Sequence, residues 1–366
     1  MKKALRNIHL WLSVPLGLVI AVVCFTGAML VFEQEIVSVT HRKLLFTDDA
    51  PGRPLPLDTL MGRAVQSLPP GAKATGVSVS SDPRRAYRVN LSEPRGAAIV
   101  IDQYTGRVRG VYERPAFFRV MFSLHRWLLD SPRRGEASWG KVVVGVSVIM
   151  FVLALLSGVA VWWPRRGQGL RRALTVTARH GSHRLWHSLH CAGGMYAVVL
   201  LLAMSLTGLT WSFRWYNAAF YKLFGVENTG RGGHGPAKAE QKGSRGYASW
   251  RAALDGTKAA RPDFRQITVS HGTLKVSSAR YGNTRATDTY TFCPSTGRLL
   301  QAKLYADAAK QSKIRGWIYS VHVGSFGGLL TRLLWFVAAL LGALLPLTGY
   351  YLWYRRASRR RPGGKG

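Results

Sequence analysis

The sequence has few acidic residues and few cysteines. Its 366 residues include 51 Lys and Arg against 17 Asp and Glu, which gives a formal net charge of +34. The three cysteines, Cys24, Cys191 and Cys293, lie far apart and predict neither a disulfide framework nor a metal-thiolate cluster. No G-x-G-x-x-G motif follows an expected strand, and no flavin motif is evident. These absences disfavour a disulfide scaffold, a thiolate metal site and a nucleotide-cofactor dehydrogenase.

Long apolar segments, by contrast, recur along the chain. A helix needs about 20 apolar residues to cross a bilayer. Four segments meet this length: residues 8–32, 139–163, 187–213 and, together with an interfacial turn, 319–354. The first exceeds the ~7–15 apolar residues of a signal peptide and has no small-x-small cleavage site, so we interpret it as an anchor. The sequence therefore predicts a multi-pass α-helical membrane protein.

Basic residues cluster beside these segments. They lie at the N-terminal tip, in the loop 164–186 and in the tail 355–366. Because positively charged flanks stay in the cytoplasm, both termini and this loop are expected inside. Residues 33–120 and 214–318 then form external domains, and residues 121–138 form an external interfacial segment. The same placement favours anionic lipid, and not nucleic acid, as a partner.

The chain contains an internal repeat. DQYTGRV at 102–108 resembles CPSTGRL at 293–299, and LLSGVAVWWPRR at 155–166 resembles LPLTGYYLWYRR at 345–356. Each half consists of a membrane helix, an external domain and a second membrane helix. The first helix of both halves begins on the cytoplasmic side, which makes the repeat parallel. The expected fold is a four-helix membrane bundle of two parallel repeats. An α+β domain is inserted between the first and second spans and another between the third and fourth.

Six strands are expected in the external domains, because their residues alternate in polarity or are β-branched. They cover residues 76–80, 86–92, 97–102, 264–270, 273–278 and 288–292. The Gly- and Lys-rich segment 228–246 is expected to be a loop.

Histidines lie at the expected ends of the spans. His9 and His190 lie on the cytoplasmic side and His125 and His322 on the outer side, with one of each pair in each half. Two imidazoles from facing helices are the axial ligands of a six-coordinate b-type haem. An ionisable residue in a membrane helix is also a functional candidate by default. We therefore expect two b-type haems, one at each membrane face.

Alternatives to this ligand set concern His187 and zinc. His187 precedes His190 by three residues on nearly the same helix face, so it could replace His190 or contact a haem propionate. Zinc is disfavoured, because two histidines without Asp, Glu or Cys make a poor tetrahedral set. A single histidine could simply lie at the interface, but four in two symmetric pairs favour haem.

These segments resemble the PepSY-associated transmembrane family, also called iron-regulated membrane proteins, over nearly the whole chain. The resemblance rests on HLWLSVPLGLVIAVVCFTG from residue 9, LHCAGGMYAVVLLLAMSLTG from residue 189 and the final PLTGYYLWYRR. DQYTGRV and CPSTGRL resemble the end of PepSY modules, although Cys293 replaces an expected acid or amide. The family includes siderophore reductases of the bacterial inner membrane with periplasmic domains and two b-type haems. It therefore implies His9, His125, His190 and His322 as haem ligands here, and the same location.

The resulting hypothesis is a di-haem reductase that moves electrons from the cytoplasmic side to a periplasmic ferric chelate. A ferric siderophore is the expected acceptor, and Fe(II) is released because hard oxygen ligands hold it less tightly. The donor is a cytoplasmic protein, a soluble reductant or a quinol. The rivals are a non-enzymatic uptake or transport component and a membrane-anchored peptide-binding protein. A transporter would need a charged or unwound midspan site, and an anchor would not need symmetric histidines.

Overall fold

The computed structural model describes residues 2–47, 52–132, 136, 138–163, 169–179, 181–227, 247–278 and 282–358. The chain forms two compact units, each assembled from both halves of the sequence. One is helical (Met1–Glu33, Ala116–Glu227 and Val321–Gly366), and the other contains a sheet (Gln34–Pro115 and Asn228–Ser320). The loop expected at 228–246 and the tail beyond residue 358 lie outside the described residues.

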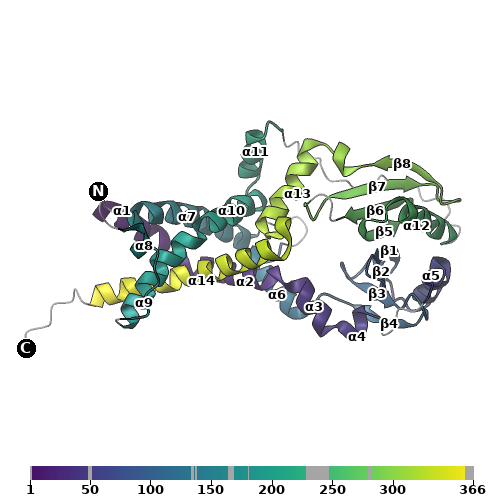
Figure 1. The fold of residues 1–366 in the computed structure, drawn as a ribbon, viewed down its shortest axis with the longest axis horizontal. Coiled ribbons are helices and arrows are strands. Elements are labelled where there is room, and N and C mark those ends of the chain that lie inside the picture. The colour runs from purple at the N-terminus through teal and green to yellow at the C-terminus, as the bar shows by residue number, and fades with distance from the viewer. Residues whose placement is uncertain are drawn as a thin grey trace, which may run out of the picture. The chain divides into compact units, whose positions relative to one another are not determined.

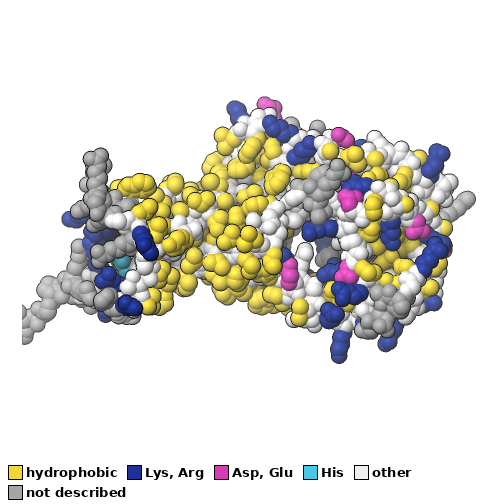
Figure 2. Space-filling model, in the orientation of Figure 1, with side chains coloured by type: hydrophobic (Ala, Val, Ile, Leu, Met, Phe, Trp, Pro, Cys, Tyr) yellow, Lys and Arg dark blue, Asp and Glu magenta, His cyan; other side chains and the backbone are white. Residues whose placement is uncertain are grey.

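The helical unit consists of long helices and several short ones (Figure 1). Three of its described helical segments are long and apolar enough to cross a bilayer: Trp139–Trp162, Ser182–Ser212 and Ser325–Ser358. Figure 2 shows hydrophobic side chains over these helices and Lys and Arg side chains near α1 and the end of α14. The elements are α1 (Lys2–Ser13), α2 (Gly17–Val31), α6 (Ala116–Trp127), α7 (Trp139–Trp162), α8 (Leu170–Ala173), α9 (Ser182–Ser188), η1 (Leu189–Gly193), α10 (Gly194–Ser212), α11 (Arg214–Leu223), η4 (Ser325–Gly327) and α14 (Gly328–Ser358).

The first expected span, residues 8–32, is not one helix. Helices α1 and α2 meet at an angle of 65°, and counted together they give a fourth candidate span. Pro15 lies at the break, where its missing N–H and fixed φ interrupt helical hydrogen bonding. The Tyr350 hydroxyl of α14 compensates: it donates to the Val14 carbonyl at 2.6 Å and accepts from the Leu18 N–H at 3.1 Å. The bend is therefore fixed by side-chain hydrogen bonds.

Apolar and small residues pack the bundle core. Ile20 of α2, Phe151 of α7, Leu201 of α10 and Ala338 of α14 are buried in one cluster. A Cβ at Gly342 would lie 2.7 Å from the Leu201 side chain and 3.0 Å from Cys24 Sγ, so only glycine fits there without movement. Close approach of α14 to its neighbours therefore depends on a small residue, as is common between membrane helices.

The second unit is built on one antiparallel sheet of eight strands in the order β4-β3-β2-β1-β5-β6-β7-β8. The sequence predicted a separate domain in each half, but β1 pairs directly with β5 and joins the halves. Pairing removes two exposed edges, one from each four-stranded half, which would otherwise invite association with other chains. The strands are β1 (Ala74–Ser80), β2 (Tyr87–Leu91), β3 (Ala98–Ile101), β4 (Val108–Tyr112), β5 (Phe264–Ser270), β6 (Thr273–Ser278), β7 (Thr287–Phe292) and β8 (Leu299–Lys303).

All six expected strands are confirmed, and β4 and β8 were missed. Two helices, α5 (Leu57–Gln66) and α12 (Ala248–Ala260), bury their apolar sides with one face of the sheet. Met61 and Trp250 from these helices share a core with Val89 and Ile267 from the strands. The remaining elements are α3 (Glu33–Thr40), α4 (Arg42–Leu45), η3 (Tyr305–Asp307) and α13 (Lys310–His322), whose last two residues belong to the helical unit.

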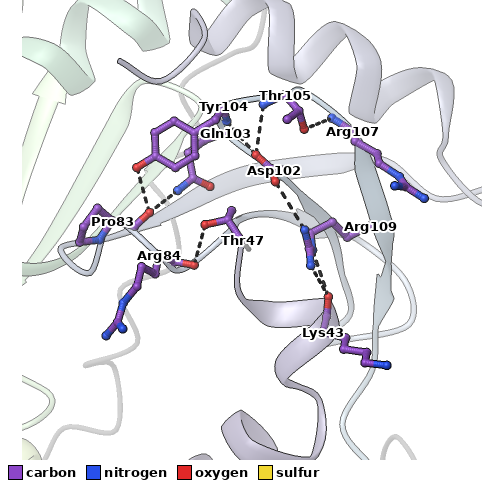
Figure 3. A network of polar contacts seen from close by, with 10 residues as sticks. All are labelled: Lys43, Thr47, Pro83, Arg84, Asp102, Gln103, Tyr104, Thr105, Arg107 and Arg109. Atoms are coloured by element: carbon purple, nitrogen blue, oxygen red, sulfur yellow. Dashed lines mark hydrogen bonds and ion pairs between the residues drawn. The ribbon is translucent and has the colours of Figure 1, made fainter. Parts of the chain in front are cut away.

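The DQYTGRV motif forms the turn between β3 and β4 (Figure 3). One carboxylate oxygen of Asp102 accepts from the N–H groups of Tyr104 at 2.9 Å and Thr105 at 3.1 Å, and the other faces Arg109 Nη1 at 3.4 Å. Gly106 has φ +69°, a conformation that glycine adopts without strain. The motif therefore specifies its turn by a side-chain cap and a left-handed glycine.

Candidate functional site

The helical unit brings His9 and His190 together. His9 lies on α1 and His190 on η1, a π-helical turn, and their ring centroids are 6.4 Å apart with the planes at 79°. A π turn adds a residue to the helical register, and such turns are frequent at functional sites. We call His9 and His190 the inner pair.

His125 and His322 form a second pair. His125 lies near the end of α6 and His322 ends α13, and their ring centroids are 6.1 Å apart with the planes at 56°. Trp211 of α10 packs edge-on against His322 with ring centroids 5.1 Å apart. We call His125 and His322 the outer pair. The two pairs join the first and second halves of the chain, as the sequence predicted.

Each histidine is held through Nδ1 by a neighbouring helix. The Nδ1 contacts are His9 with Ala154 O at 3.0 Å, His125 with Val23 O at 2.8 Å, His190 with Thr348 Oγ1 at 2.9 Å and His322 with Met204 O at 2.9 Å. A carbonyl oxygen can only accept, so Nδ1 carries the proton in three of the four rings. The lone pair is then on Nε2, the arrangement of a neutral histidine that ligates a metal.

Each imidazole also packs against a glycine. A Cβ at the glycine would lie close to Cε1 of the ring: 3.2 Å for Gly158 and His9, 2.9 Å for Gly27 and His125, 3.5 Å for Gly349 and His190, and 3.0 Å for Gly208 and His322. Each of these glycines follows Ser157, Thr26, Thr348 or Thr207. The four Ser/Thr-Gly dipeptides are a signal that the sequence contained, but sequence reasoning did not connect them to the rings they support.

Each histidine is hydrogen-bonded and packed by a helix of its own half of the chain, whereas the two histidines of each pair come from different halves. In the first half His9 rests on α7 and His125 on α2, and in the second His190 rests on α14 and His322 on α10. Each half therefore orients its own two histidines, and the site arises where the halves meet.

The two pairs are separated along the bundle. His190 lies in η1, which leads directly into α10, and Gly208, which supports His322, lies 18 residues after His190 near the end of α10. At 1.5 Å per residue this corresponds to about 27 Å of helix. One pair therefore lies toward each end of a membrane-length helix.

A cavity of about 930 Å³ surrounds the inner pair. Besides His9 and His190 it is lined by apolar side chains and by cationic and imidazole groups: Arg6, His183, His187, Arg355 and Arg356. The volume and apolar lining are typical of a small-molecule or cofactor site. The guanidinium groups would suit carboxylates at its rim.

His187 lies in this cavity but does not pair with His9. Its ring stacks on His183 with centroids 6.5 Å apart, and its Nε2 lies 3.9 Å from Cys191 Sγ. The structure therefore places His190 opposite His9 and leaves His187 beside the pair.

The donor set fits axial ligation of a haem. An imidazole nitrogen binds a transition-metal ion at about 2 Å, so two rings facing one ion from opposite sides have centroids about 6 Å apart. Both pairs have this spacing. Among the described residues, no group of three or more His, Cys, Asp and Glu could hold a metal ion, so neither pair resembles a tetrahedral zinc site. The glycines let the imidazole rings approach the neighbouring helices closely, and the buried Nε1 of Trp335, whose side chain packs against Gly324, has no hydrogen-bond partner.

Taken together, the fold defines a multi-pass membrane protein with histidine pairs between its two halves and an antiparallel sheet unit. The family model for the PepSY-associated TM region matches residues 6–356, and the chain belongs to this family. A search of curated proteins found no match. The resemblance noted from the sequence is therefore confirmed over nearly the whole chain.

Proposed function

We propose that the protein carries electrons across the bacterial inner membrane and reduces a ferric chelate in the periplasm. The inner pair, His9 and His190, would hold one b-type haem and the outer pair, His125 and His322, a second. Each haem, when bound, would supply a one-electron iron couple in the membrane. The acceptor is a ferric siderophore, whose Fe(III) takes one electron and is released as Fe(II).

The observation that carries this proposal is the repeated support of all four imidazoles. Their Nδ1 atoms are hydrogen-bonded and their Cε1 edges rest on glycine, so each Nε2 is oriented at low conformational cost. Such outer contacts fix the tautomer and the ring orientation of metal-binding histidines. A membrane anchor or a peptide-binding module has no need of four oriented imidazoles.

The separation of the pairs favours transfer between membrane faces. Basic residues flank α1 and the end of α14, which the positive-inside rule assigns to the cytoplasm. The inner pair would then receive electrons from a cytoplasmic protein, a soluble reductant or a quinol. Arg6, Arg355 and Arg356 at the inner cavity would hold propionates through charge-assisted hydrogen bonds.

An absorption spectrum of the detergent-purified protein tests the proposal. We expect sharp low-spin α and β bands after dithionite reduction and two haems per chain in a pyridine haemochrome assay. The reduced protein should then be reoxidised by a ferric siderophore, with Fe(II) trapped by a chromogenic chelator. Absence of haem in protein produced with adequate haem supply would overturn the proposal and leave the transport and peptide-binding hypotheses.

A further inference from the structure

The two faces of the eight-stranded sheet differ in chemistry. The face under α5 and α12 is apolar, with Val77, Val89 and Val276 in its core. Because successive strand residues point to opposite sides, the residues between them point away from the helices. The strand register aligns six of these in a line across six strands: Arg88, Ser78, Thr268, Lys275, Thr289 and Lys303. We call this line the cation–hydroxyl row.

Hydroxyl-bearing residues separate the three cations of the row. At about 4.8 Å per strand, Arg88 and Lys275 lie about 14 Å apart, and Lys275 and Lys303 about 10 Å apart. Between the first two cations, Ser78 Oγ and Thr268 Oγ1 are hydrogen-bonded at 3.1 Å. The row therefore offers hydroxyl groups flanked by positive charge on either side.

Carboxylates are missing from this face of the sheet. None of its strand residues, all of which the structure describes, is acidic. Yet most of the acidic residues of the chain belong to the sheet unit. Asp288, the acidic residue of β7, is buried on the helix side, where it pairs with Arg261. Within the strands, therefore, no carboxylate lies beside the cations of the row.

Arg88 is the most enclosed cation of the row. Its guanidinium packs 4.6 Å above the Tyr112 ring, and its Nε is buried without a hydrogen-bond partner. Burial lowers the pKa of this guanidinium, whereas the neighbouring Tyr112 acts in the opposite direction. A partly desolvated cation that lacks a carboxylate is stabilised by a bound anion.

We propose that the cation–hydroxyl row docks an anionic, oxygen-rich ferric chelate, which would be the acceptor in the proposed function on which this inference rests. Charge complementarity favours an anion, and gaps of about 10–14 Å suit a compact small molecule. Docking on a lipid surface uses exposed apolar residues beside the cations, whereas Val100, which pairs with Arg88, is fully buried. The row selects anionic over neutral chelates and concentrates them at the sheet unit.

Binding of a redox-inert probe tests the docking separately from electron transfer. The probe is a gallium(III) complex of a hexadentate tris-catecholate, with a net charge of −3, titrated calorimetrically into the full chain in detergent. The double variant Lys275→Glu/Lys303→Glu changes two exposed side chains and should weaken binding by roughly tenfold. A neutral gallium tris-hydroxamate should bind more weakly to the wild type and be little affected by the double variant.

Lys310→Glu is the matched control, because Lys310 is exposed in the same unit but lies on α13 and outside the sheet. It should alter binding of the anionic probe by less than about twofold. Equal weakening by the control and the double variant, or no binding by the wild type, would overturn the docking proposal. Weaker binding in the double variant alone would support it, even if the protein held no haem and the proposed function failed.

Discussion

The two halves of the chain agree inside the helical unit and differ at the turns of the sheet unit. In both halves, two histidines rest on Ser/Thr-Gly dipeptides of the same half. The external turns instead diverge: Asp102 and Arg109 of the first half correspond to Cys293 and Leu300 of the second. The carboxylate and its guanidinium partner are thus absent together, which avoids leaving one buried charge unpaired.

This difference separates what the site needs from what the fold needs. Each pair takes one histidine from each half, so both halves must retain the Ser/Thr-Gly dipeptides that orient these histidines. Each turn only closes a hairpin, for which a Gly with positive φ, Gly106 or Gly297, is sufficient in either half. The symmetric part of the molecule therefore marks the candidate site.

The largest expected effect comes from removing one histidine of a pair. His322→Ala should abolish the outer haem and leave the inner one, because His9 and His190 are unchanged. Reductase activity should fall by more than the 10–100-fold that loss of an outer-shell contact typically costs. Haem content and reduced-minus-oxidised spectra of the purified variant provide the measurement.

His187→Ala is the control for this experiment and should retain both haems. The opposite outcome, loss of the inner haem in His187→Ala but not in His190→Ala, would show that the pairing of His9 with His190 is not the ligand pair.

A smaller effect is expected from filling the glycine supports, which are tighter at the outer pair than at the inner pair. A Cβ in Gly27→Ala would lie 2.9 Å from His125 Cε1, so the ring must move, whereas Gly349→Ala would place it 3.5 Å from His190, an ordinary contact. Overpacking costs about 1–3 kcal/mol, which corresponds to roughly 5- to 150-fold in haem affinity. Haem retention during dilution should fall for Gly27→Ala and not for Gly349→Ala. Equal retention would mean that the glycine contact does not position His125.

Sequence reasoning located the histidines but not their supports. Polarity and the repeat were sufficient to place His9, His125, His190 and His322 at span ends, because hydropathy reports membrane boundaries directly. They could not indicate that His125 rests on Gly27, a contact between residues far apart in the chain. Nor could they choose between His187 and His190, since that choice depends on the π-helical turn η1.

The sheet unit was predicted strand by strand, but its assembly was not. Alternation along β1 and β5 indicates which side chains are buried and carries no information on the partner strand. The single eight-stranded sheet arises from the β1–β5 pairing between halves. Strand β8 was missed because most of its residues are exposed and its pattern does not alternate.

The next effect concerns the external turns. Asp102→Ala removes the acceptor of two backbone N–H groups and leaves Arg109, itself largely buried, without its carboxylate. We expect a loss of about 2–4 kcal/mol in unfolding free energy. Cys293→Ala should have a much smaller effect, and Cys293→Asp should raise the melting temperature slightly by restoring the cap. Thermal unfolding of the three variants measures the difference. A larger loss in Cys293→Ala than in Asp102→Ala would contradict the comparison.

The smallest effect leaves stability unchanged and appears only as reactivity. Hydrogen bonds from Ser295 and Thr296 lower the pKa of the Cys293 thiol to about 6. Because the pKa is lowered, the thiolate already predominates at neutral pH, and protonation removes it only as the pH falls through about 6. Alkylation by iodoacetamide, followed by peptide mass spectrometry, should therefore reach its plateau near pH 7 and decline below pH 6. Ser295→Ala removes the 3.1 Å contact to Cys293 Sγ and should move this profile to higher pH. An unshifted profile in that variant, or a wild-type midpoint near the ordinary thiol value of about 8.5, would show that Ser295 and Thr296 do not stabilise the Cys293 thiolate.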